Sequence, residues 1–295
     1  MAKFKIFTDS CSDLGTIVRK KYDIDYVHMG LVVDGVEKRA DLDWVDYSPE
    51  EFYGWLKAGK KVKTTQVSVT EFLDCFRPAL KEGYDILYLG CSSALSGSVN
   101  TCEVLVIPQL KEEFPDRKVI AIDTLLASGV EGMITVRAAE LRAEGKSLEE
   151  VAAWCEENKK YFNQFATVDT LNYLKAAGRI KGAKAFFGNL FHKRPVFLSD
   201  RHGANTVIKT VTGSKNSYNE LINLAKENIA NSEDKRVFVG HGDDMDTALM
   251  LKDRLLKETE AKEVIMSIVG PITGVTCGPG VVVVGTFGEE TPEIK

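Results

Sequence analysis

Short apolar runs alternate with segments of helical spacing in the first half of the chain. The runs that are typical of buried strands cover residues 3–7, 85–90 and 118–123. The segments between them open with residue pairs that suit a helix cap, namely Ser48 with Glu51, Ser68 with Glu71 and Ser147 with Glu150. Strands separated by helices indicate parallel pairing, so this half is predicted to be a three-layer domain around a parallel sheet.

The second half mixes strands and helices in a different order. Two apolar runs, 195–199 and 205–211, are separated only by "DRHGAN", which has the composition of a hairpin turn and predicts antiparallel pairing. A helix is expected at 218–230, with further strands within 236–244, 263–270 and 280–287. The chain is therefore predicted to be an α/β protein of two domains, 1–160 and 161–295, the second with a mixed sheet.

Composition narrows the class of protein. The 295 residues are 44% hydrophobic and 27% charged, which suits an ordinary globular protein, and the formal charge of -5 makes nucleic acid an unexpected partner. The six cysteines form no C-x-x-C and have no histidine at ligand spacing, so reduced thiols and no metal site are expected. The polar start and the lack of a run near ~18 apolar residues predict a cytoplasmic protein without stable membrane insertion.

Small hydroxyl side chains gather after the second predicted strand. Open parallel sheets bind ligands at the carboxyl ends of their strands, which directs attention to the loops at 8–14, 90–98 and 123–129. The middle loop, "GCSSALSGS", holds Ser92, Ser93, Ser96 and Ser98. These serines either cap and pack the following helix or make a site for an anionic oxygen at its amino-terminus, and both interpretations stay open.

Two further stretches offer similar chemistry. Thr64 and Thr65 in "KTTQVS" are either a polar lead-in to a capped helix or further neutral donors for a carboxylate. In the glycine-rich stretch 269–285, Thr276 and Cys277 either belong to a tight link between strands or line a close approach of backbone to a ligand.

Enzyme motifs are mostly absent. The chain has no G-x-x-x-x-G-K-[ST], no G-x-G-x-x-G and no G-x-S-x-G, so no nucleotide or other cofactor is expected. The alternative to a binding protein is a hydrolase or phosphatase that uses Ser96 or Asp9 with His241, the one histidine predicted at a strand end. A turn histidine is commoner than a catalytic one, so a non-catalytic protein is the preferred hypothesis.

The segment 176–195 combines an apolar face with positive charge. Its apolar residues are Phe186, Phe187, Leu190 and Phe191, and its basic residues are Arg179, Lys181, Lys184, Lys193 and Arg194. The segment is either a core-facing helix with a solvated basic side or a lid whose basic rim suits an amphiphile or an acidic partner protein.

Taken in order, these stretches resemble the DegV family of bacterial fatty-acid-binding proteins. The resemblance runs through "FTDSCSDL", "KTTQVS", "CSSALSGS", "VDTLNYLKAAGRI", "KRPVF", "GHGDD" and "GPITGVTCGPG", which span nearly the whole chain. It implies a two-domain α/β protein that encloses one long-chain fatty acid between its domains, with the acyl chain in a buried tunnel. It also implies similarity to the non-catalytic binding subunit of fatty acid kinase, which presents its ligand to a separate ATP-dependent subunit.

The resemblance also assigns residues. It places the carboxylate donors at Thr64, Thr65 and Ser96, with Ser92 and Ser93 before it, and it places the arginine of "AGRI", Arg179, on the surface that meets the kinase. The basic residues Lys193 and Arg194 are further candidates for that surface. Where the family usually has histidine and threonine, this chain has Thr276 and Cys277; Thr276 is still expected to donate to the carboxylate, but the histidine's capacity for positive charge is lost.

Overall fold

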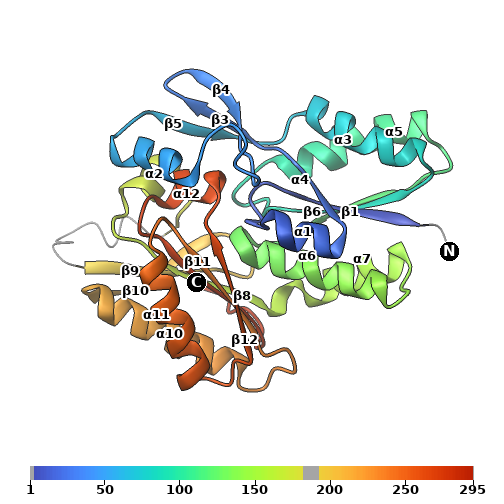
Figure 1. Ribbon diagram of the computed structural model, residues 1–295. Helices are drawn as coiled ribbons and strands as arrows, with labels where there is room; N and C mark the ends of the chain where they lie inside the picture. The colour runs from blue at the N-terminus through green and yellow to red at the C-terminus, as the bar shows by residue number, and fades with distance from the viewer. Residues whose placement is uncertain (1–2, 182–192, 295) are drawn as a thin grey trace.

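The computed structural model describes residues 3–181 and 193–294, whose strands form three sheets (Figure 1). The first sheet is parallel throughout, as predicted. Its strands, in spatial order, are β2 (Ile24–Val27), β1 (Phe4–Asp9), β6 (Asp85–Gly90) and β7 (Val119–Asp123). Every residue of β6 is buried, which explains its unbroken apolar run.

Helices cover both faces of this parallel sheet, which confirms the three-layer prediction (Figure 1). One face carries α3 (Val69–Lys81), α4 (Ser98–Thr101), the π-helical turn η1 (Cys102–Val106) and α5 (Ile107–Glu113). The other face carries α1 (Thr16–Tyr22), α6 (Ser128–Ala143) and α7 (Leu148–Asn158).

Two of the three predicted capping boxes are present, at α2 (Pro49–Lys57) and at α7. At α3, the Ser68 side chain accepts from the backbone of Glu71, as expected for a cap. The Glu71 carboxylate, however, accepts from the backbone N–H of His28 at 3.2 Å and lies 2.6 Å from its Nδ1. The reciprocal half of this predicted box is therefore wrong, because a partner distant in sequence takes the carboxylate.

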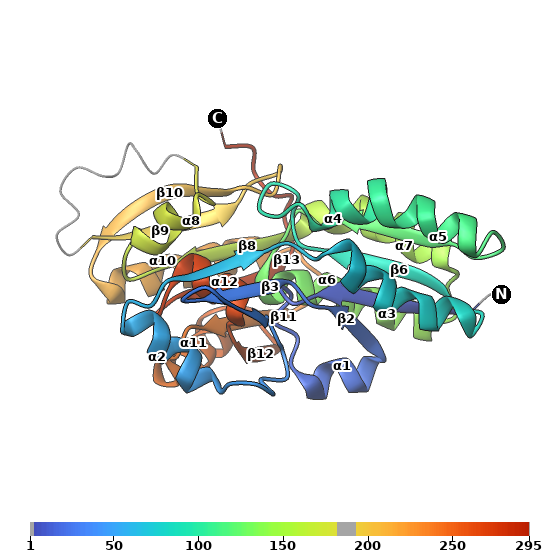
Figure 2. The same cartoon turned by 90° about the horizontal axis from the view of Figure 1, so that it is seen from above.

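The second sheet is mixed, as predicted. In spatial order it contains β10 (Asn205–Thr212), β9 (Lys193–Ser199), β8 (Phe162–Thr167), β13 (Val282–Phe287), β11 (Arg236–His241) and β12 (Glu263–Ile268). β9 and β10 form the expected antiparallel hairpin, whereas β11 and β12 pair in parallel. The single turn η2 (Lys159–Tyr161) precedes β8, and α10 (Ser214–Ile229) and α11 (Met245–Glu258) pack on this sheet (Figures 1 and 2).

Helix α6 joins the two halves of the molecule. It packs against β1 and β6 of the parallel sheet and against β8, β11 and β13 of the mixed sheet. Its burial on several sides follows from this position, and one apolar core runs through both halves. All strands of the mixed sheet follow residue 161, while the predicted domain boundary at 160/161 remains a prediction.

A small antiparallel sheet was not anticipated from the sequence. It contains β4 (Val36–Arg39), β3 (Gly30–Val33) and β5 (Val62–Thr65), and it extends from the N-terminal half toward α12 (Pro271–Cys277) (Figure 1). Helix α12 itself lies in the glycine-rich stretch and packs on α2, β5 and α8 (Asn172–Ala177). These contacts bring Thr64 and Thr65 close to the C-terminal half.

Two predictions concern membranes and the basic segment. In the part of the chain that the structure describes, no helix is both long and apolar enough to cross a membrane. The basic segment 176–195 was expected to be either a core-facing helix or a lid. Its four apolar residues, Phe186, Phe187, Leu190 and Phe191, lie outside the described residues, as does Lys184.

Candidate ligand-binding site

A cavity lies between the two halves, at the carboxyl ends of the parallel strands. Its volume is about 110 Å³. All three loops that the sequence singled out contribute to its wall, with Cys11 after β1, Ser96 after β6 and Ala127 after β7. The other half contributes residues from β8, β9, β13 and α12.

The lining of this cavity changes from polar and open to apolar and buried. Exposed or half-buried polar side chains form its mouth: Thr64, Thr65, Gln66, Ser96, Arg179 and Thr276. Buried side chains form its interior. Most are apolar side chains or thiols, namely Cys11, Met29, Cys91, Ala127, Ala166, Phe197, Ile272, Cys277 and Val283, and three are polar, namely Gln164, Asn205 and Thr273. Such a gradient matches a ligand with a polar head and a hydrocarbon tail.

Ser96 is held at the mouth by a local hydrogen-bond network. Its Oγ lies 3.0 Å from the Oγ of Ser98 and accepts from the backbone N–H of Ser98 at 3.3 Å. The Oγ of Ser98 in turn accepts from the backbone N–H of Val67 at 3.1 Å. This network fastens the serine loop to the chain just after β5, which places the Ser96 and Thr64 hydroxyls in one wall.

Gln66, within the motif "KTTQVS", also belongs to this wall, although the sequence did not single it out as a ligand contact. Its Nε2 donates to the hydroxyl of Thr101 at 2.7 Å, which fixes the amide. A Cβ on Gly97 would lie only 2.1 Å from the Oε1 of Gln66, so the amide could keep this position only beside a glycine. The neighbouring Thr65 covers Gly30 in the same way, with its Oγ1 2.1 Å from where a Cβ would lie.

Thr276 reaches the cavity from α12, but its hydroxyl proton is already used. The hydroxyl donates to the carbonyl oxygen of Ile272 at 3.1 Å, one helical turn earlier. Its oxygen remains an acceptor, and donation to a ligand would require this bond to be exchanged. Burial raises the pKa of the neighbouring Cys277 thiol, so this residue is neutral near pH 7.

Two predicted donors do not line the cavity. Ser92 is fully buried, and its hydroxyl donates to the carbonyl oxygen of Gly203 at 2.8 Å while accepting from the backbone N–H of Ala94. Ser93 is exposed, and its backbone N–H donates to Asp123. Ser92 thus links the serine loop to the turn of the β9–β10 hairpin, and this hydrogen bond connects the two halves of the protein.

The three predicted partner-facing cations differ in their surroundings. Arg179 is exposed and also lines the cavity mouth, where its Nε donates to the carbonyl oxygen of Leu95 at 3.1 Å. Lys193 is exposed at the start of β9. Arg194 does not fit a partner-facing role, because its guanidinium is buried, pairs with Asp169 and contacts Tyr218.

The geometry does not support the alternative of a hydrolase or phosphatase. His241 is buried, its Nδ1 accepts from the backbone N–H of Asp244 at 3.2 Å, and burial lowers its pKa. Asp9 is also buried and accepts from the backbone of Cys11 and Cys91. Within the described residues, His241 has no hydrogen bond to Ser96 or Asp9, and neither His241 nor Asp9 lines the cavity.

The fold and the cavity define a two-domain α/β protein with a partly polar, partly apolar cavity between its sheets. A family model described as an uncharacterised protein of the DegV family matches residues 3–289. A DegV domain-containing protein of Clostridium perfringens is 32% identical over 289 residues, which cover 98% of this chain and 99% of that protein. The chain belongs to the DegV family, as the resemblance implied.

Relatives of this protein have been described as binding lipids. A protein of Thermotoga maritima named fatty acid-binding protein is 32% identical over 300 residues, covering 99% of each chain. A solved DegV family structure from Thermus thermophilus, described as showing fatty acid binding, has a TM-score of 0.85 at 30% identity and covers 97% of this chain and 100% of its own. A DegV lipid binding protein of Thermotoga maritima gives 0.83 at 31% identity, covering 98% and 100%. The two-domain α/β fold is confirmed by these similarities.

Proposed function

We propose that this protein binds one long-chain fatty acid in the cavity between its halves. The carboxylate lies at the mouth, where Thr64, Ser96 and Arg179 offer hydroxyl and guanidinium donors. The acyl chain extends into the buried apolar interior toward Ala166 and Phe197. The observation that carries this proposal is the gradient of the lining, from exposed donors at the mouth to mostly apolar side chains inside.

The acyl chain and the carboxylate contribute unequally to the binding free energy. Each buried methylene contributes roughly 0.8 kcal/mol, whereas one hydrogen bond to a carboxylate contributes about 1.5 to 3 kcal/mol net. The tail therefore supplies most of the affinity, and the donors at the mouth fix which end of the ligand stays outside. A carboxylate held at an exposed mouth is accessible to a second protein.

The second part of the proposal concerns that second protein. By similarity to the binding subunit of fatty acid kinase, the protein presents its ligand to a separate ATP-dependent subunit and performs no catalysis itself. The sequence supports this role because it contains no phosphate-binding loop. Arg179 and Lys193, both exposed, are the cations offered to the partner. Formation of acyl phosphate from ATP and fatty acid by that catalytic subunit should require this protein.

Mass spectrometry of the ligand released from the purified, denatured protein tests the binding proposal. We expect a long-chain fatty acid in the wild-type protein and much less in Ala166→Trp, because the indole fills the interior next to Phe197. Ser93→Ala is the matched control, since Ser93 lies outside the cavity. A wild-type protein that holds no acyl chain and fails to bind added fatty acid contradicts the proposal. Turnover of simple esters or phosphates that is lost in His241→Ala would favour the enzyme instead.

A further inference from the structure

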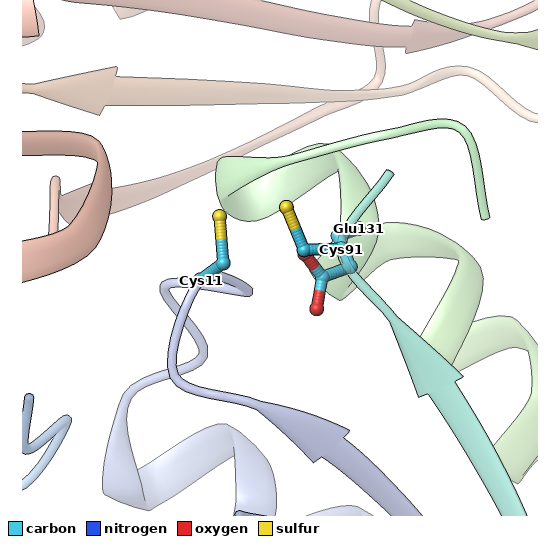
Figure 3. A group of neighbouring side chains, drawn as sticks. All are labelled: Cys11, Cys91 and Glu131. Atoms are coloured by element: carbon cyan, nitrogen blue, oxygen red, sulfur yellow. The ribbon is translucent and has the colours of Figure 1, made fainter. Parts of the chain in front are cut away.

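Two thiols and a carboxyl group that are far apart in the sequence meet in the wall of the cavity. Cys11 comes from the loop after β1, Cys91 from the loop after β6 and Glu131 from α6 (Figure 3). The sulfur atoms and a carboxylate oxygen lie within 4.8 Å of one another, and all three side chains are buried. Sequence spacing gave no sign of this group, because its members are joined only by the fold.

The Glu131 carboxyl group has one hydroxyl donor and lies within hydrogen-bond reach of the Asp9 carboxyl group. Its Oε1 accepts from the hydroxyl of Thr8 at 2.9 Å, but its Oε2 is fully buried and accepts from no N–H or hydroxyl group of the described residues. A buried oxygen without a donor is costly unless a proton or a cation occupies the space beside it.

Among the residues that the structure describes, no cation donates a hydrogen bond to the carboxyl groups next to this group. Besides Glu131, two more carboxyl groups are buried next to the group, those of Asp9 and Asp13. Their hydrogen-bond donors in the described residues are neutral: backbone N–H groups of Cys11, Cys91 and Gly270, and hydroxyls of Tyr88 and Ser128. A cation held by the three side chains would compensate this concentration of acidic groups.

Hydrogen bonds with neighbouring residues position Cys11, Cys91 and Glu131. The Asp9 carboxylate accepts from the backbone N–H of Cys11 at 2.9 Å and of Cys91 at 3.0 Å, so one side chain positions both cysteines. Thr8 positions Glu131 from the same strand. Outer groups of this kind orient metal ligands and strengthen binding.

We propose that Cys11, Cys91 and Glu131 bind a thiophilic divalent cation such as Zn²⁺. Zinc takes thiolates at about 2.3 Å and carboxylates at about 2.1 Å, which separates tetrahedral donors by about 3.5 to 3.8 Å. Donors now within 4.8 Å of one another need to close by only about 1 Å. Two thiols and one carboxyl group release their protons to solvent as the cation binds.

The fourth coordination position faces the cavity. Cys11 and Cys91 line the cavity, whereas Glu131 lies behind them, so the side of the cation opposite Glu131 is open to water or to an anionic oxygen of a ligand. Three protein ligands with one open position distinguish this arrangement from a closed structural site. The inference does not depend on the identity of the ligand in the cavity.

The test uses the full-length protein, reduced, treated with a chelator and desalted. We expect saturable binding of one Zn²⁺ per chain in titration calorimetry. With Co²⁺ as the probe, we expect the near-ultraviolet charge-transfer absorption of cobalt thiolates. Cys11→Ser, Cys91→Ser and Glu131→Gln should each weaken Zn²⁺ binding by at least about tenfold, as loss of a ligand or of its outer support does.

Cys75→Ser is the matched control, because Cys75 is a free thiol outside the group and should leave binding unchanged. Circular dichroism checks that each variant is folded, and the cobalt spectrum of the wild-type protein serves as a readout that needs no variant. Absence of saturable Zn²⁺ binding by the folded wild-type protein overturns the proposal. So does Co²⁺ binding without thiolate absorption, or Zn²⁺ binding that the Cys11 and Cys91 variants retain in full.

Discussion

Replacement of Ser96 by alanine separates the head-group contribution from the tail contribution to fatty acid affinity. The change removes one hydroxyl at the cavity mouth and leaves the donors of Thr64, Gln66 and Arg179 in place. A hydrogen bond to a charged group is worth about 1.5 to 3 kcal/mol, which corresponds to about 12- to 160-fold weaker binding. A tail that buries about twelve methylenes contributes roughly 10 kcal/mol, so binding should be weakened but not lost.

The assay is titration of delipidated protein with a fluorescent or isotopically labelled long-chain fatty acid. Ser93→Ala is the control on the same loop, and it should leave the dissociation constant unchanged because Ser93 is exposed and does not line the cavity. Thermal unfolding must accompany the titration, since the Ser96 hydroxyl also accepts from the backbone of Ser98. Complete loss of binding by a folded Ser96→Ala, or an equal effect of Ser93→Ala, would refute the assignment.

Three further changes test separate parts of the structure. Gly278→Ala should lower the free energy of unfolding by at least about 1 to 3 kcal/mol, because φ is 82° and the new Cβ would lie 2.2 Å from the Tyr173 ring. Gly15→Ala, with nothing within 4 Å, should cost far less in the same urea titration, and equal costs would contradict the steric argument. Asp200→Asn should destabilise the protein by about 1 to 3 kcal/mol near pH 7. Burial by itself raises the pKa of this carboxylate, but hydrogen bonds from several donors outweigh burial and lower the pKa. That stability is present above the unfolded-state pKa and is lost as pH falls through the lower folded-state pKa, so the difference from wild type should shrink below about pH 4; a pH-independent difference would exclude this origin. Arg179→Gln should weaken binding of a fatty acid about two- to fivefold at low salt but not that of the matching alcohol, and equal effects on both ligands would show that its charge is not used.

Features that depend on local chemistry were predictable. The pattern of buried strands, the Ser48 and Ser147 capping boxes, and the hairpin turn between β9 and β10 all follow from residues close together in sequence. The family could be predicted because each of its motifs is a short stretch of sequence, and the order of the motifs can be read along the chain without the fold. Predictions failed where a distant partner competed, as when His28 takes the Glu71 carboxylate from its expected cap.

Among the candidate site residues, sequence proximity was a poor guide to position. Ser92 and Ser96 have the same side chain on one loop, yet Ser92 donates across the domain interface to Gly203 while Ser96 lines the cavity. Arg194 and Arg179 carry the same charge, yet Arg194 is buried against Tyr218. Which hydroxyl or cation is available depends on what packs against it, and that neighbour comes from another element.

The sequence by itself determined the α/β class, the parallel and mixed sheets and the family, because periodicity, turns and motifs act over a few residues. Only the tertiary structure decided which side chains lie together in the wall of the cavity. The third sheet brings Thr64 to α12, and packing of α6 between the sheets brings Glu131 to Cys11 and Cys91. These proximities join positions up to hundreds of residues apart, and they are fixed by burial of apolar faces whose partners no local pattern specifies.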